Sequence, residues 1–79
     1  KNADDYFAGI LELPPKARII KPLDRLDNLD CIHWEPARRQ RYIDETVARI
    51  LPIANFLDQK VVAAINAKLD ILRASLEAA

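Results

Sequence analysis

The chain has 79 residues, about half the length of a typical domain of about 100–150 residues, so its hydrophobic core must be small. Twelve basic residues balance twelve acidic residues, and a net charge of zero argues against a general nucleic-acid binder or a binder of anionic membranes. A lone cysteine, Cys31, excludes an internal disulfide, and Cys31 with His33 supplies too few ligands for a closed zinc site.

The sequence has no apolar run long enough for a membrane span or a secretory leader. Together with the free thiol, this favours a cytoplasmic protein. The chain contains no methionine and begins with Lys1, so we expect a processed product or a piece of a longer protein.

The composition predicts an all-α fold, because one glycine, one serine and one threonine leave almost no residues suited to hairpin turns. A first short helix is expected over residues 4–11, followed by a break at two consecutive prolines. A second helix is expected over residues 15–29, with a kink at the proline inside it. The five prolines that divide the chain are Pro14, Pro15, Pro22, Pro36 and Pro52.

A third helix should begin at residues 35–36 and bend or break at Pro52. Asp58 is the predicted N-cap of a last helix, which should fold back on the third as an antiparallel helical hairpin. Each helix of this hairpin carries an apolar stripe at alternating spacings of three and four residues. The stripes are Ile43, Val47, Ile50, Ala54 and Leu57 in the third helix, and Val61 or Val62, Ile65, Leu69, Leu72 and Leu76 in the last.

The most informative polar residues gather on one face of the second helix, opposite Ile19, Leu23 and Leu26. A carboxylate on this face can ligate a divalent metal, and the cations one turn away can meet phosphate oxygens. The plainer alternative is a solvated face with weak pairs between residues four apart. The side chains on this face are Arg18, Lys21, Asp24, Arg25 and Asn28.

Two further groups of residues have less specific meanings. His33 and Trp34 are expected to be packed corner residues between the second and third helices, and Cys31 a small buried hydrophobe. Three arginines near the start of the third helix raise the alternative of a DNA-binding helix-turn-helix, but acidic residues follow at once and the net charge is zero. These arginines are Arg38, Arg39 and Arg41.

Two short motifs resemble a known family. Residues 19–28 read Ile-Ile-Lys-Pro-Leu-Asp-Arg-Leu-Asp-Asn; residues 45–46 read Glu-Thr, and after five residues 52–54 read Pro-Ile-Ala. This order and spacing resembles the HD-domain metal-dependent phosphohydrolases, in the branch of the RelA/SpoT-like guanosine polyphosphate pyrophosphohydrolases. The resemblance covers about residues 6–57, and it implies that residues 1–79 are the C-terminal portion of a single HD-type helical domain.

The resemblance implies roles for four residues of the second helix. Asp24 matches the last metal ligand of the family, and Asn28 matches a residue that helps to hold the nucleotide. Lys21 and Arg25 would support substrate binding electrostatically. The divalent metal, manganese in well-known members, would polarise a phosphate and generate hydroxide from bound water.

The family's other metal ligands, a histidine and a histidine–aspartate pair, have no counterpart before Asp24. Residues 1–79 alone are therefore expected to be inactive, and no catalytic residue is assigned within them. An N-terminal portion or a partner chain would have to supply the missing metal ligands. The implied ligand is a nucleotide or another phosphorylated small molecule, with no membrane and no nucleic acid as partner. The family's histidine before the asparagine is Asp27 here, and its arginine–threonine pair is Asp30-Cys31, so guanosine polyphosphate is not singled out as the substrate.

The alternative from a different class is a helical interaction or oligomerisation module without chemistry. Such a module would use an exposed apolar face of the last hairpin to bind a partner or a second copy. Its association would not depend on a metal, whereas the hydrolase would require one.

Overall fold

The computed structural model describes residues 3–78, and every regular element within them is a helix, which confirms the all-α prediction. The first helix also begins and ends close to its predicted bounds. In chain order the elements are α1 (Ala3–Leu11), α2 (Pro15–Arg18), α3 (Ile20–Asn28), α4 (Pro36–Glu45), the π-helix η1 (Thr46–Ile50), α5 (Leu51–Asn55) and α6 (Gln59–Glu77).

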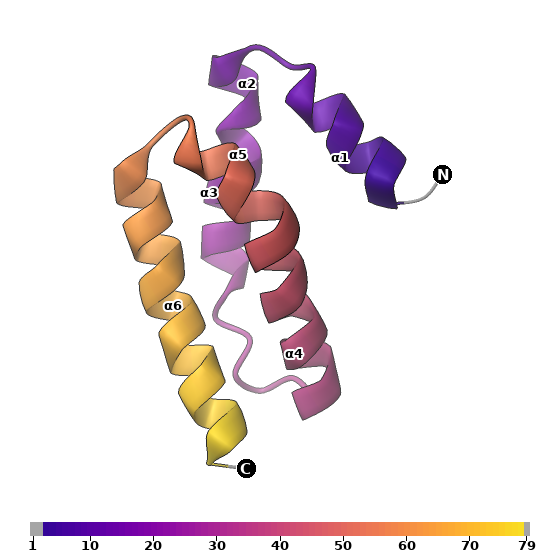
Figure 1. The fold of residues 1–79 in the computed structure, drawn as a ribbon. Coiled ribbons are helices and arrows are strands. Elements are labelled where there is room, and N and C mark those ends of the chain that lie inside the picture. Colours follow the sequence, from indigo (N-terminus) through magenta and orange to yellow (C-terminus); the bar gives the residue numbers. More distant parts are fainter. Residues whose placement is uncertain (1–2, 79) are drawn as a thin grey trace.

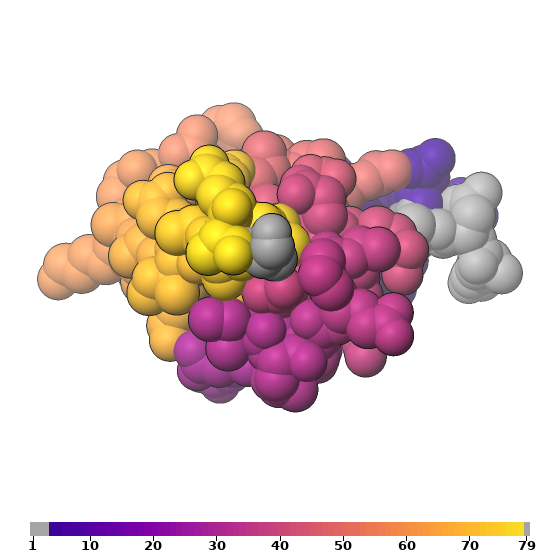
Figure 2. Space-filling model, turned by 90° about the horizontal axis from the view of Figure 1, so that it is seen from below, coloured from indigo at the N-terminus to yellow at the C-terminus, as the bar shows by residue number. Residues whose placement is uncertain are grey.

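The helices form a small bundle in which α4, η1 and α5 follow one another as a nearly continuous rod (Figure 1). After the turn that follows α5, α6 runs back beside this rod, and α3 contacts both α6 and η1. Figure 2 shows the opposite end, where the last turns of α6 lie beside the start of α4 and the segment after α3. The helix α1 stands to one side of the bundle.

The core lies between α3, the rod and α6, and the stripe predicted for the last helix is its most regular part. Val61, Ile65, Leu69 and Leu72 are buried, so Val61 rather than Val62 faces inward. Asp58 caps α6 as predicted, because its Oδ1 accepts a hydrogen bond from the Lys60 backbone N–H at 2.8 Å. The other buried apolar residues are Phe7, Ile10, Leu29, Cys31, Ile43, Ile50, Ile53 and Ala54.

The single kinked helix predicted over residues 15–29 is wrong, because the chain forms two helices that meet at Ile19. Pro22 then lies in the first turn of α3. A proline ring clashes with the carbonyl four residues earlier, here that of Arg18, and has no N–H to donate. The N–H groups in the first turn of a helix have no acceptor within that helix, so a proline there costs no hydrogen bond. Because the chain breaks at Ile19, Pro22 falls in such a first turn and causes little strain.

The third predicted helix continues through Pro52 by means of η1, which closes with a hydrogen bond from the Leu51 N–H to the Thr46 carbonyl. A π turn holds more residues than an α turn and often lies where an α-helical hydrogen bond is blocked. Across η1 the spacing of three and four residues no longer places side chains on one face of the helix. The prediction that Val47 is buried is therefore wrong, since its exposed fraction is 41% and Thr46 is buried instead.

No helix within residues 3–78 is both long and apolar enough to cross a bilayer.

Candidate functional site

The four residues predicted as site residues lie on α3, but the structure divides them between two faces. Asp24 and Asn28 are exposed, and the Asn28 Nδ2 donates to the Asp24 Oδ2 across one helical turn at 3.5 Å. Lys21 is half-buried, with its Nζ 5.1 Å from the centroid of the Tyr6 ring on α1. Arg25, in contrast, is buried with an exposed fraction of 5%.

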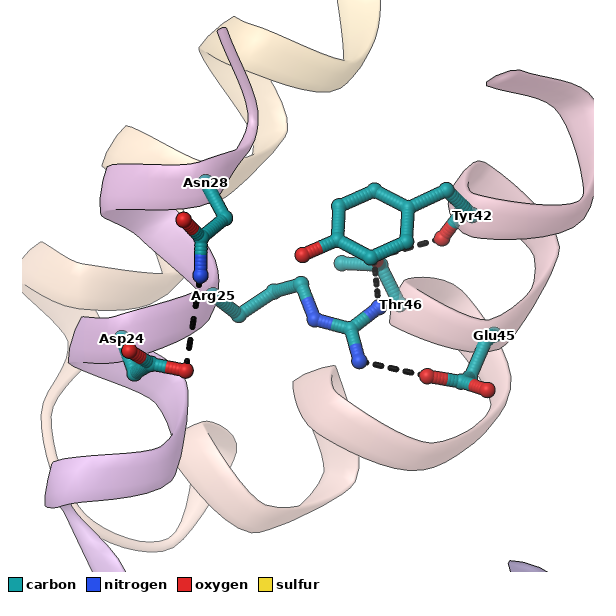
Figure 3. A network of polar contacts seen from close by, with 6 residues as sticks. All are labelled: Asp24, Arg25, Asn28, Tyr42, Glu45 and Thr46. Carbon is teal, nitrogen blue, oxygen red and sulfur yellow. Dashed lines mark hydrogen bonds and ion pairs between the residues drawn. The ribbon is translucent and has the colours of Figure 1, made fainter. Parts of the chain in front are cut away.

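Arg25 turns away from the exposed face and reaches across to the rod, where it has three partners (Figure 3). Its Nη2 donates to the Glu45 Oε1 at 2.5 Å, and its Nη1 donates to the Thr46 Oγ1 at 3.1 Å. Its Cζ lies 4.1 Å from the centroid of the Tyr42 ring. The Thr46 hydroxyl in turn donates to the Tyr42 carbonyl at 2.7 Å, so this hydroxyl both accepts from Arg25 and donates to the backbone of α4.

The inward face of α3 therefore differs from the one that periodicity predicts. Pro22, Arg25 and the following Leu29 are buried, whereas Leu23, predicted to face the core, has an exposed fraction of 43%. An arginine can occupy a core position when a carboxylate and further acceptors compensate its charge. These acceptors come from about 20 residues further along the chain, so the local apolar pattern could not reveal them.

Tyr42 lies between the buried Arg25 and the exposed face of α3 that carries Asn28, and the sequence pattern did not single it out. Figure 3 shows its hydroxyl directed towards α3, on the side where Asn28 lies. Burial raises the pKa of the Tyr42 phenol, while the Arg25 guanidinium works in the opposite direction. The phenol is therefore protonated and uncharged at neutral pH, and it can donate a hydrogen bond towards the exposed polar face of α3.

Asp24 and Lys21 also border a shallow groove of about 440 Å³ between α1 and the α2–α3 segment. The rest of the groove is mainly apolar, and it leads from the exposed carboxylate towards α1. Its lining residues are Tyr6, Ile10, Leu13, Ala17, Ile20, Lys21 and Asp24.

Residues 3–78 do not contain a complete metal centre, because no three histidine, cysteine or carboxylate side chains come close enough to hold an ion. Cys31 is buried, as expected, and desolvation raises the pKa of its thiol, which keeps it protonated. The expectation that His33 is a packed corner residue is wrong, since it is exposed, while Trp34 is half-buried against Tyr42. Asp24 alone does not fit a divalent ion, which requires several ligands.

The three arginines of the basic cluster on α4 do not form one surface. Arg38 and Arg41 are exposed, but Arg39 is buried and its Nη1 donates to the Ser75 Oγ of α6 at 2.7 Å. The DNA-reading alternative needs these cations free to meet phosphates, and one of the three is committed to the bundle.

Comparison of the chain with protein-family models, with curated proteins and with solved structures finds no match in any of the three. Function must therefore be inferred from the geometry around Asp24, Arg25 and Asn28 and from the motif resemblance.

Proposed function

We propose that this chain is the C-terminal part of an HD-type metal-dependent phosphohydrolase that acts on a nucleotide or another phosphorylated small molecule. The observation that supports this proposal is the contact of Arg25 with Glu45 and Thr46. Arg25 belongs to the first of the two motifs that carry the family resemblance, and Glu45-Thr46 opens the second. One buried side chain therefore joins the two motifs in space. Their spacing along the sequence alone does not require such a contact.

Within this proposal Asp24 is a metal ligand. Its carboxylate is exposed, and its described hydrogen bond is to the neutral amide of Asn28, so its charge remains available to a cation. Asn28 lies one turn further on the same face and would contact the nucleotide. Lys21 lies one turn before Asp24 and adds positive charge that suits a phosphate.

Arg25 has a different role from the one that the resemblance implies. Because it is buried and engaged by Glu45, Thr46 and Tyr42, we propose that it positions α3 against α4 and does not contact the substrate. Its effect on the site passes through the orientation of Asp24 and Asn28, its neighbours on the same helix.

The proposal requires the other metal ligands to come from residues outside these 79, either an N-terminal portion or a partner chain. An ion bound by the full set, manganese by analogy with the family, would act as a Lewis acid on phosphate and activate water. Residues 3–78 alone should therefore show no hydrolysis.

The test is nucleotide hydrolysis by the full-length natural protein that contains this chain, with Mn²⁺ added, comparing Asp24→Asn with Asp27→Asn. Both carboxylates are exposed on α3, which makes Asp27→Asn a matched control. We expect Asp24→Asn to abolish metal-dependent phosphate release and Asp27→Asn to retain it, with unchanged circular dichroism in both. Retained turnover in Asp24→Asn, or no metal-dependent hydrolysis by the parent protein, contradicts the proposal.

A second candidate is the non-catalytic interaction module, and one observation favours it. Phe56, in the turn between α5 and α6, has an exposed fraction of 88%, which is high for a large aromatic side chain. This candidate predicts association that persists in chelator and is lost in Phe56→Ser, measured by sedimentation velocity. Association that chelator abolishes contradicts it.

A further inference from the structure

The helix α1 has a defined orientation beside the bundle, because two of its apolar side chains are buried. Phe7 and Ile10 have exposed fractions of 5% and 8%. Phe7 lies towards the rod, where Arg49 of η1 pairs with Asp4 and has its Cζ 5.6 Å from the centroid of the Phe7 ring. Ile10 lines the groove between α1 and the α2–α3 segment. Packing therefore sets which side of α1 faces α3.

Tyr6 lies on this side of α1 and lines the groove together with Lys21 of α3. Its ring meets the Phe7 ring edge to face, with 5.2 Å between the centroids, so a buried neighbour restrains its orientation. The Lys21 Nζ lies 5.1 Å from the centroid of the Tyr6 ring. An ammonium at this distance is attracted by the negative face of the ring, and more strongly when it is partly withdrawn from water, as in the half-buried Lys21.

The contact with Tyr6 leaves the charge of Lys21 available to a ligand. Among residues 3–78 no carboxylate forms an ion pair with Lys21, although Asp24 lies one helical turn further on and lines the same groove. A lysine and a carboxylate three residues apart on a helix are close enough to pair. Such a pair would neutralise both the cation that suits a phosphate and the carboxylate that suits a metal. An aromatic ring attracts the ammonium without neutralising its charge, so its N–H groups remain available to an anion.

We propose that Tyr6 is a positioning residue, which holds the Lys21 ammonium in the groove beside Asp24, where it binds a phosphate group of the substrate. This inference rests on the proposed function, in which Lys21 supplies positive charge to a phosphorylated ligand. It makes α1 part of the functional site, although neither motif of the family resemblance includes Tyr6. The effect of Tyr6 on the ligand passes through Lys21.

The first experiment follows the Lys21 side chain by NMR while the chain is titrated with inorganic phosphate, without divalent metal. We expect the Lys21 ε-methylene signal to lie upfield, because the Tyr6 ring shields it, and to shift saturably with phosphate. Sodium chloride of matched ionic strength is the blank. Tyr6→Leu keeps the apolar bulk but has no ring, so the upfield position should be lost. The affinity for phosphate should fall about three-fold, as expected for an exposed cation–π contact, and Tyr6→Phe should restore both.

The second experiment is a double-mutant cycle on nucleotide hydrolysis by the full-length natural protein that contains this chain, with Mn²⁺ added. Lys21→Met keeps most of the apolar stem but removes the charge. Tyr6→Leu should raise KM about three-fold with kcat unchanged, and it should have no further effect when Lys21→Met is already present. A purely structural role of Tyr6 in packing α1 would change the kinetics equally in both backgrounds. Equal effects therefore overturn the positioning role.

Failure of this role and failure of the proposed function are distinguishable. Metal-dependent hydrolysis with a KM that Tyr6→Leu does not change leaves the hydrolase and overturns the role of Tyr6. Phosphate binding at Lys21 that weakens in Tyr6→Leu and recovers in Tyr6→Phe, together with no hydrolysis by the parent protein, leaves the positioning role and contradicts the hydrolase. No saturable phosphate shift at Lys21, or equal affinities in Tyr6→Leu and Tyr6→Phe, overturns the positioning role.

Discussion

Two buried arginines join α4 and its continuation to the rest of the bundle, and they differ in how their charge is compensated. Arg25 is 5% exposed and has a carboxylate, a hydroxyl and an aromatic face as partners. Arg39 is 7% exposed, and its described hydrogen bond is to the neutral hydroxyl of Ser75. Within residues 3–78 its Nε has no hydrogen-bond partner.

Similar burial therefore does not mean a similar contribution to stability. A buried charge is costly unless an opposite charge and further hydrogen bonds compensate it. At Arg25 the compensation is nearly complete, so loss of a partner should be costly. At Arg39 it is partial, so replacing the arginine with an apolar side chain of similar length should cost little.

The largest effect is expected for Glu45→Ala, which leaves the Arg25 guanidinium buried without its carboxylate. We expect a loss of about 3 kcal/mol in the free energy of unfolding, at the lower end of the range for breaking a buried pair, because Glu45 is partly exposed. Urea denaturation measures it. Asp44→Ala is the control, since Asp44 is exposed and accepts only from Gln40 among its described contacts, at 2.9 Å. Similar losses in the two variants would contradict the assigned role of Arg25.

An effect of intermediate size is expected when the free energies of unfolding of Arg39→Met and Arg25→Met are compared. Methionine retains the length and apolar contacts of the arginine stem but removes the charge. Arg39→Met should stay within about 1 kcal/mol of the wild type, whereas Arg25→Met should lose about 2 kcal/mol. For a chain of this size, thermal unfolding should separate the two variants by several degrees. A larger loss for Arg39→Met would reverse the comparison.

The smallest effect is expected at an ion pair on the surface. Arg49 of η1 pairs with Asp4 of α1, and both side chains are partly or largely exposed. Asp4→Asn should therefore change the free energy of unfolding by less than about 0.5 kcal/mol, and less still at high salt. A double-mutant cycle with Arg49→Gln measures the coupling. A coupling above about 1 kcal/mol would show that α1 is held more firmly than its position beside the bundle suggests.

The parts of the fold that follow from local pattern could be predicted from the sequence. The burial of Ile65, Leu69 and Leu72, and the Asp58 cap, depend on residues within one or two turns of each other. The prolines likewise marked where the helices are interrupted. Only the form of each interruption, a break at Ile19 and a π turn before Pro52, was missed.

The candidate site was less predictable, because its arrangement depends on one long-range contact. Arg25 looks like a surface residue when α3 is considered alone, and only Glu45 and Thr46 make its burial possible. The spacing did place Asp24 and Asn28 together on one exposed face. The contacts of Trp34 with Arg38 and Tyr42 were not predicted either, since they form only when the segment before α4 folds against that helix.

The π turn at Thr46–Ile50 sets the rotational phase between the two halves of the rod. On the near side of it, Tyr42 and Glu45 face Arg25; on the far side, Ile53 and Ala54 face the core. Because a π turn contains one residue more than an α turn, deleting one residue within it would restore an ordinary α turn and leave both halves of the rod facing as they do now. A deletion in the α-helical part of the rod would instead rotate the residues beyond it by about 100° and break one of the two sets of contacts. The π turn is therefore the one part of the rod whose length can change without disturbing the contacts on either side.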